Sequence, residues 1–121
     1  MANDFKRFQV SSASTSTGAS GSTAYTVPAG AGSSALESIV IGITLSNKTA
    51  TGITADVYLD GFGGTDTYIV KGASIPAGSS LEVMAGNKLV LQNNGTTGDI
   101  IKITSGTATA LDATVSVLED V

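Results

Sequence analysis

The chain has 121 residues, which is enough for one domain and too few for two of ordinary size. Its net charge is −4 with only 6 Lys and Arg, so we expect no nucleic-acid binding through a basic surface. His and Cys are both absent, which excludes disulfides, thiolate chemistry, imidazole bases and the commonest zinc ligands.

The composition favours short strands and tight turns. Hydrophobic residues make up 41% of the chain, charged residues only 13%, and 15 glycines accompany many Ser and Thr. No segment has the apolar core of a secretory signal or approaches the roughly 20 apolar residues of a membrane-spanning helix. We therefore expect a soluble protein, made in a cytoplasm, with no membrane partner.

The N-terminal residues predict either a short edge strand or an arm. Residues 5–10 alternate loosely in polarity, and residues 11–23 (SSASTSTGASGST) have the composition of a flexible linker. We therefore divide the chain into an N-terminal arm and linker, residues 1–23, and a β-sandwich domain, residues 24–121. A partner-docking role for the arm would use its aromatic and basic side chains, Phe5, Lys6, Arg7 and Phe8. The alternative is a frayed terminus or an ordinary edge strand.

The stretch from Glu37 to Gly61 gives the clearest signal of fold. It contains two runs of alternating polarity around a polar connector, residues 47–52, and so predicts a long antiparallel hairpin. The predicted core face carries Ile39, Ile41, Ile43, Leu45, Ile53, Val57 and Leu59, and the other face carries Val40, Thr44, Thr54 and Tyr58. On this prediction Ile41→Ala should cost roughly 2–5 kcal/mol.

The rest of the chain predicts further short strands separated by turns. They cover residues 24–27, 67–71, 81–84, 88–92, 99–104 and 108–119, with Ile101, Ile103, Leu111, Ala113, Val115 and Val117 facing the core. We find no amphipathic helix. The fold class is therefore all-β, a single antiparallel β-sandwich of about seven to nine strands, jelly-roll or immunoglobulin-like. Two similar segments, 27–30 (VPAG) and 75–78 (IPAG), predict two similar crossings between sheets.

The acidic turns are weak candidates for chemistry. Asp60 and Asp66 flank a glycine-rich turn, and Asp99 follows the pair Asn93-Asn94. Calcium needs six to eight oxygen ligands, whereas Asp, Asn and Gly are the ordinary turn formers, so we predict no metal site. Ser and Thr are abundant, but a nucleophilic hydroxyl needs a base, and His is absent. We expect no catalytic residues, no cofactor and no enzyme activity.

Aromatic residues offer a second candidate docking patch. Tyr58 and Tyr68 are expected to pair across neighbouring strands on an outer face, and Phe62 lies in the turn between them. We interpret these side chains as a packing or subunit-docking patch. The alternative is a small sugar-binding site, which usually needs a concave pocket.

Several of these segments together resemble a known class of protein. They are Val27-Pro28-Ala29-Gly30, SIVIGITLSNKTATGITADVYL, YIVKGASIPAGSSLEV, KLVLQ and IIKITSGTATALDATVSVLED. In style and order they are similar to small virion structural proteins of tailed bacteriophages, particularly marine ones. The resemblance implies a β-sandwich subunit on the virion, carried in many copies, with no active site.

The function that we expect is capsid decoration, or cement. The partners would be the major capsid protein, or other virion proteins, and further copies of the chain in a homo-oligomer. The few charges of the outer faces suit close subunit contact, since fewer charges must lose water. The alternatives are a neck, tail or fibre subunit and, in another class, a carbohydrate-binding or adhesion module.

Overall fold

The computed structural model describes residues 3–16, 21–62, 64–84 and 88–120. Within these ranges it contains nine strands and no helix, which confirms the predicted all-β class. Sheet A contains β1 (Asn3–Val10), β9 (Leu111–Asp120), β3 (Leu36–Asn47), β6 (Ser80–Glu82) and β7 (Leu89–Asn93). Sheet B contains β2 (Ser22–Thr26), β8 (Ile100–Ser105), β4 (Ile53–Asp60) and β5 (Asp66–Ile75). The described residues hold no helix that could span a membrane.

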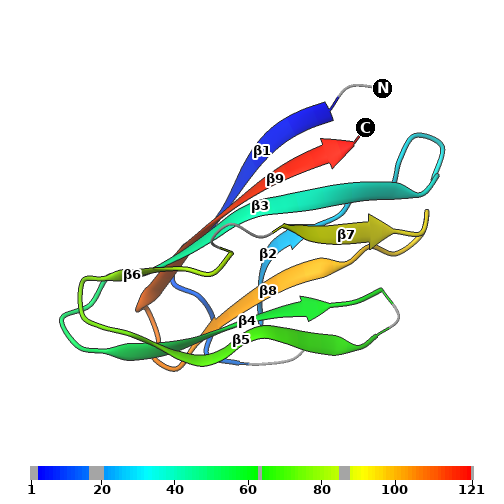
Figure 1. Ribbon diagram of the computed structural model, residues 1–121. Helices are drawn as coiled ribbons and strands as arrows, with labels where there is room; N and C mark the ends of the chain where they lie inside the picture. Colours follow the sequence, from blue (N-terminus) through cyan, green and yellow to red (C-terminus); the bar gives the residue numbers. More distant parts are fainter. Residues whose placement is uncertain (1–2, 17–20, 63, 85–87, 121) are drawn as a thin grey trace.

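The strand pairing is nested. β1 pairs with β9, β2 with β8, β3 with β6 and β7, and β4 with β5, all antiparallel. The chain is thus folded like one long hairpin whose tip lies between β4 and β5. This hairpin is wrapped into two sheets, in which β3 also pairs with β9 and β4 also pairs with β8. This is jelly-roll connectivity, one of the two predicted sandwich types. It places the N- and C-terminal strands side by side (Figure 1).

The predicted hairpin between Glu37 and Gly61 is wrong in its pairing. Both of its strands exist, as β3 and β4, but they lie in different sheets. The polar connector therefore crosses between the layers, and the hairpin in this region is β4–β5. Alternating polarity shows that a strand buries one face, but it does not show which strand lies beside it.

The predicted core face of β3 is wrong in its first half. Val40 pairs with Val117 and Gly42 with Ser116, so Ile41 is an extra residue in a β-bulge. Before the bulge Leu36, Ser38 and Val40 face the core, and after it Ile43, Leu45 and Asn47 do. Ile39 is therefore only half-buried and Ile41 is 39% exposed, while Val40 is fully buried.

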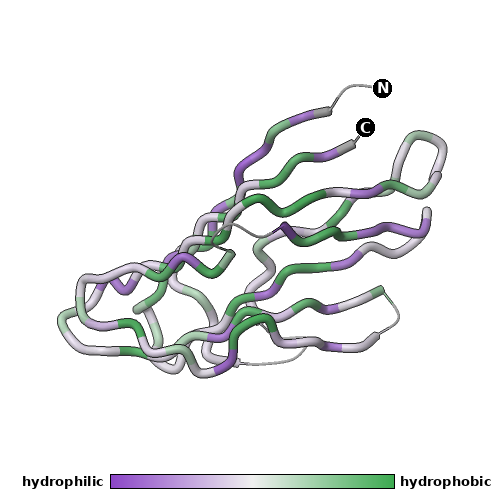
Figure 2. Tube along the Cα trace, viewed as in Figure 1, coloured by the Kyte–Doolittle hydropathy of each residue, from purple (hydrophilic) through white to green (hydrophobic). Residues whose placement is uncertain are grey.

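The core lies between the two sheets and is aliphatic. The predicted inward rows of β8 and β9 are confirmed, as are Ile43, Leu45, Ile53 and Val57. Figure 2 shows the apolar stretches along β3 and β8. β8 differs from the prediction in that Lys102 and Thr104, on its outer face, are buried as well.

The connector from β1 to β2 covers one end of the sandwich. Ala13 is buried and donates its N–H to Leu111, and Ser14 accepts the N–H of Ser105. A Cβ at Gly21 would clash with the Tyr58 hydroxyl, so the backbone there lies against the outer face of sheet B. The described part of this Ser- and Thr-rich run is therefore packed on the domain, although its composition is that of a linker.

The two crossings with similar sequences both run from sheet B to sheet A, as predicted. Each is held by a buried asparagine through the carbonyl that precedes its proline. Asn93 donates to the Val27 carbonyl at 2.8 Å, and Asn47 donates to the Ile75 carbonyl at 3.0 Å. Asn47 also accepts the N–H of Thr49, so one side chain ties the β3–β4 crossing to the β5–β6 crossing.

Replacing Asn47 by alanine is expected to lower the free energy of unfolding by roughly 1–3 kcal/mol, because the buried carbonyl of Ile75 loses its donor. Urea unfolding of the two proteins measures the difference. Asn94→Ala is the control, since Asn94 is exposed and bonds only within its own turn. Equal losses for the two variants would contradict the role of Asn47.

Candidate docking surface

The arm residues lie in β1, which is fully paired with β9 from Asn3 to Val10. In the structure this segment is thus an edge strand, one of the alternatives left open by the sequence. Phe5 and Arg7 are exposed and face away from the core, and Phe5 is the most exposed large hydrophobic residue, at 77%. Phe8 is half-buried and packs on Tyr25, with ring centroids 4.8 Å apart.

Lys6 belongs to a polar cluster that the sequence did not predict. Its ammonium lies 2.9 Å from Oε1 of Glu119, a carboxylate whose side chain is only 2% exposed. The other oxygen, Oε2, accepts a hydrogen bond of 2.6 Å from the Tyr25 hydroxyl, which also lies 2.8 Å from Ser38 Oγ. The cluster therefore joins β1, β2, β3 and β9 between the sheets.

The cluster shifts two pKa values. The hydrogen bond and charge of Glu119 raise the pKa of Lys6 above its ordinary value. Burial, followed by the hydrogen bond to Glu119, raises the pKa of Tyr25 well above 10. Both shifts favour the protonated forms, so at neutral pH the cluster is a stable lysine–carboxylate–phenol contact. Oε2 of Glu119 accepts the hydrogen bond of Tyr25, whereas Oε1 is buried without a further hydrogen bond among the described residues and is balanced by the ion pair with Lys6.

The second predicted patch is only partly on the surface. Tyr58 and Tyr68 pair across β4 and β5 as expected, with ring centroids 5.3 Å apart. Tyr58, however, is 1% exposed, because the β1–β2 connector covers it. Tyr68 and Phe62 are 40% and 39% exposed, and Lys71 lies over the Tyr68 ring at 4.5 Å.

Burial raises the pKa of Tyr58, with a smaller effect from Asp66. The structure thus gives Tyr58 a packing role and leaves Tyr68 and Phe62 as separate exposed rings.

The acidic turn residues serve the fold. The Asp99 carboxylate accepts the N–H groups of Phe62 and Gln92, at 3.0 and 2.9 Å, and so ties the β4–β5 turn to β7. Asp60 lies 3.5 Å from Lys102, across the β4–β8 pair. In the parts of the chain that the structure describes, no three acidic side chains gather as metal ligands would.

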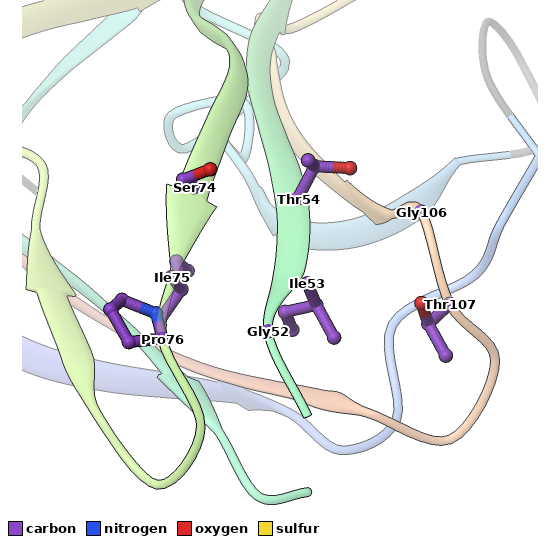
Figure 3. A pocket seen from close by; sticks show the side chains of 8 residues that line it. All are labelled: Gly52, Ile53, Thr54, Ser74, Ile75, Pro76, Gly106 and Thr107. Carbon is purple, nitrogen blue, oxygen red and sulfur yellow. The ribbon is translucent and has the colours of Figure 1, made fainter. Parts of the chain in front are cut away.

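One depression lies where β4 begins and β5 ends (Figure 3). Its volume is about 360 Å³, and Thr54, Ser74, Pro76 and Thr107 are among its lining residues. No aromatic ring lines it, so it lacks the stacking platform expected of a sugar site.

Large apolar side chains form a row across the outer face of sheet A. Phe5 pairs with Leu118, Leu118 with Ile39, and Ile39 with Val90. Phe5 and Val90 are 77% and 57% exposed, and the two central members are half-buried. The bulged Ile41 lies beside the row. We call the four aligned residues, Phe5, Leu118, Ile39 and Val90, the apolar row.

Sequence reasoning found only Phe5 of the apolar row. Ile39 was assigned to the core, as was Ile41 beside it, and no role was predicted for Leu118 or Val90. The signal available in the sequence was the presence of large apolar residues at outward positions of several strands. Their alignment depends on registers between β1, β9, β3 and β7, which alternation within one strand does not determine.

The sequence matches no protein-family model, and no curated protein is similar enough to it to give a match.

Proposed function

We propose that the protein is a structural subunit of a tailed-phage virion, and specifically a capsid decoration protein. The observation that carries the proposal is the apolar row, because contiguous apolar residues on an outer face mark a protein contact surface. Around the row the outward positions of β9 and β3 are small or uncharged, Ser116, Gly42, Thr114 and Thr44. Such a face loses little hydration energy when a partner covers it.

Three further features support an assembly role. Jelly-roll sandwiches recur in viral shells, which is an analogy of fold. The hydrogen bonds of Asp99, Asn47, Asn93 and Glu119 lie within the fold, and they stabilise turns and strand ends. The sequence also resembles small phage virion proteins. A sandwich held in this way suits a subunit that reinforces a shell by burying surface against it.

Quantitative mass spectrometry and imaging of the phage particles that encode the chain test the proposal. We expect the protein on the shell, in a copy number comparable to that of the major capsid protein. A copy number that fills only one ring, located at the neck or tail, would instead support the alternative of a neck, tail or fibre subunit. Its absence from washed particles would overturn both assignments.

A further inference from the structure

The apolar row crosses all four strand positions of sheet A. β1, β9, β3 and β7 run side by side (Figure 1), and the row takes one residue from each at the same level of the sheet. None of its four members belongs to the core cluster or packs against it. The row therefore places a continuous ridge of Phe, Leu, Ile and Val side chains on the outside of the molecule.

The charge of this face favours contact with an identical face. The chain as a whole carries −4. By strand alternation, the described charged residues of the strands on this face are Arg7, Glu37, Glu82 and Asp112. Lys88, just before β7, and Lys48, which lies 2.9 Å from Asp112, add two positive charges at its edges, so three positive residues stand against three negative ones. Their charges cancel. Two copies of an acidic protein thus repel each other least through a neutral face such as this one.

The area of the face is also adequate for a dimer. β1, β9 and β3 have 8, 10 and 12 residues, and β6 and β7 share the fourth position with 3 and 5 residues. With strands spaced by about 4.8 Å and residues rising about 3.3 Å, they cover roughly 500–700 Å². Covering one such face on each of two copies buries about 1,000–1,400 Å² in total, which lies at the lower end of specific interfaces.

From these observations we propose that sheet A binds the same face of a second copy, around a two-fold axis parallel to the strands. Such an axis places Phe5 over Val90 of the other copy and Leu118 over its Ile39. Phe, the largest side chain of the row, then meets Val, the smallest, and Leu meets Ile of equal volume, so the two sheets stay evenly spaced at about 10 Å. An axis along the row would instead stack Phe5 on Phe5 and Val90 on Val90, and the spacing would be uneven. The inference deepens the proposed function, since it names the partner of the surface on which that function rests.

The oligomeric state of the isolated full chain tests this partner. Analytical ultracentrifugation over a dilution series should show a dimer for the wild type and a monomer for Val90→Asp and for Phe5→Ser. Phe62→Ser is the matched control, because Phe62 is an exposed ring away from sheet A, and it should remain a dimer. Unchanged circular dichroism and melting temperature show that each variant is folded. A monomeric wild type, or a dimer that survives both row substitutions, would overturn the proposal.

Cross-linking tests the axis, and the absence of Cys makes introduced thiols unique. Arg7 lies next to Phe5 on the same face of β1, and Lys88 lies two residues before Val90, so thiols at these exposed positions leave the apolar row intact. A short bis-maleimide should join Arg7→Cys to Lys88→Cys in a mixture of the two variants, and should join neither variant to itself. Self-linking of Arg7→Cys would contradict the axis. The outcome is independent of the proposed function. A dimer that never binds particles would refute only the virion role, and a monomer found on particles would refute only the dimer.

Discussion

Ile43→Ala is expected to lower the free energy of unfolding by about 2–5 kcal/mol, as large-to-small changes in a packed core do. Ile43 is fully buried, and its strand, β3, is central in sheet A between β9 and the pair β6 and β7. Alanine would leave a cavity that the neighbouring β9 cannot fill, because its backbone is fixed by ladders with β1 and β3 on both sides. Guanidinium unfolding followed by circular dichroism measures the loss.

Ile41→Ala is the matched control, with the same chemistry two residues earlier in the same strand. Ile41 is 39% exposed at the bulge, so we expect a loss below about 1 kcal/mol. Uninterrupted alternation predicts equal losses at the two sites, whereas the bulge predicts a large difference. Similar losses would therefore contradict the bulge and restore the simple alternation of β3.

The existence of the strands could be predicted from the sequence, because each strand buries one row and alternation records this. Leu111, Ala113, Val115 and Val117 are an example, since β9 has a regular register and all four are buried. β3 shows the limit. One extra residue at Ile41 reverses the phase, and the sign of it in the sequence is Gly42, since an isolated glycine inside a strand pattern often marks a bulge.

Pairing and surface contacts were harder to predict because they are not local. The β3–β4 connector reads as a hairpin turn, yet it crosses between sheets, and only the nested pairing of the whole chain explains this. In the same way, Tyr58 stands on an outer face as predicted, but the β1–β2 connector covers it. The members of the apolar row align only through the registers of three strand pairs, so they looked unrelated in the sequence.

The polar cluster around Glu119 shows how the buried row of a strand can end in a charged side chain. Glu119 continues the buried row of β9 after Val117, at the open end of the sandwich where the termini meet. A buried carboxylate is stable only with partners, and Lys6 and Tyr25 supply them. Because Lys6 comes from β1, the cluster links that edge strand to the core. Asp4, which pairs in register with Glu119, is exposed.

Tyr25→Phe is expected to lower the free energy of unfolding at pH 7 by roughly 1.5–3 kcal/mol, the range for hydrogen bonds to charged groups. The ring and its contact with Phe8 remain, so the loss reports the hydroxyl that donates to the buried Glu119 carboxylate. Urea unfolding measures it. The control is Tyr68→Phe, whose exposed hydroxyl should matter little.

The pH dependence separates this hydroxyl from a general packing effect. Folding raises the pKa of Tyr25 and of Lys6. Their contributions to the free energy of unfolding are therefore complete below the pKa values of the unfolded chain, near 10, and are lost as the pH rises further. Wild-type stability should therefore fall from about pH 10 upward. In Tyr25→Phe the contributions of Lys6 and of Tyr58, whose pKa is also raised by burial, remain, and the fall should be shallower. An alkaline profile as steep as that of the wild type would mean that Tyr25 does not titrate with folding, and that the cluster is held by Lys6 alone.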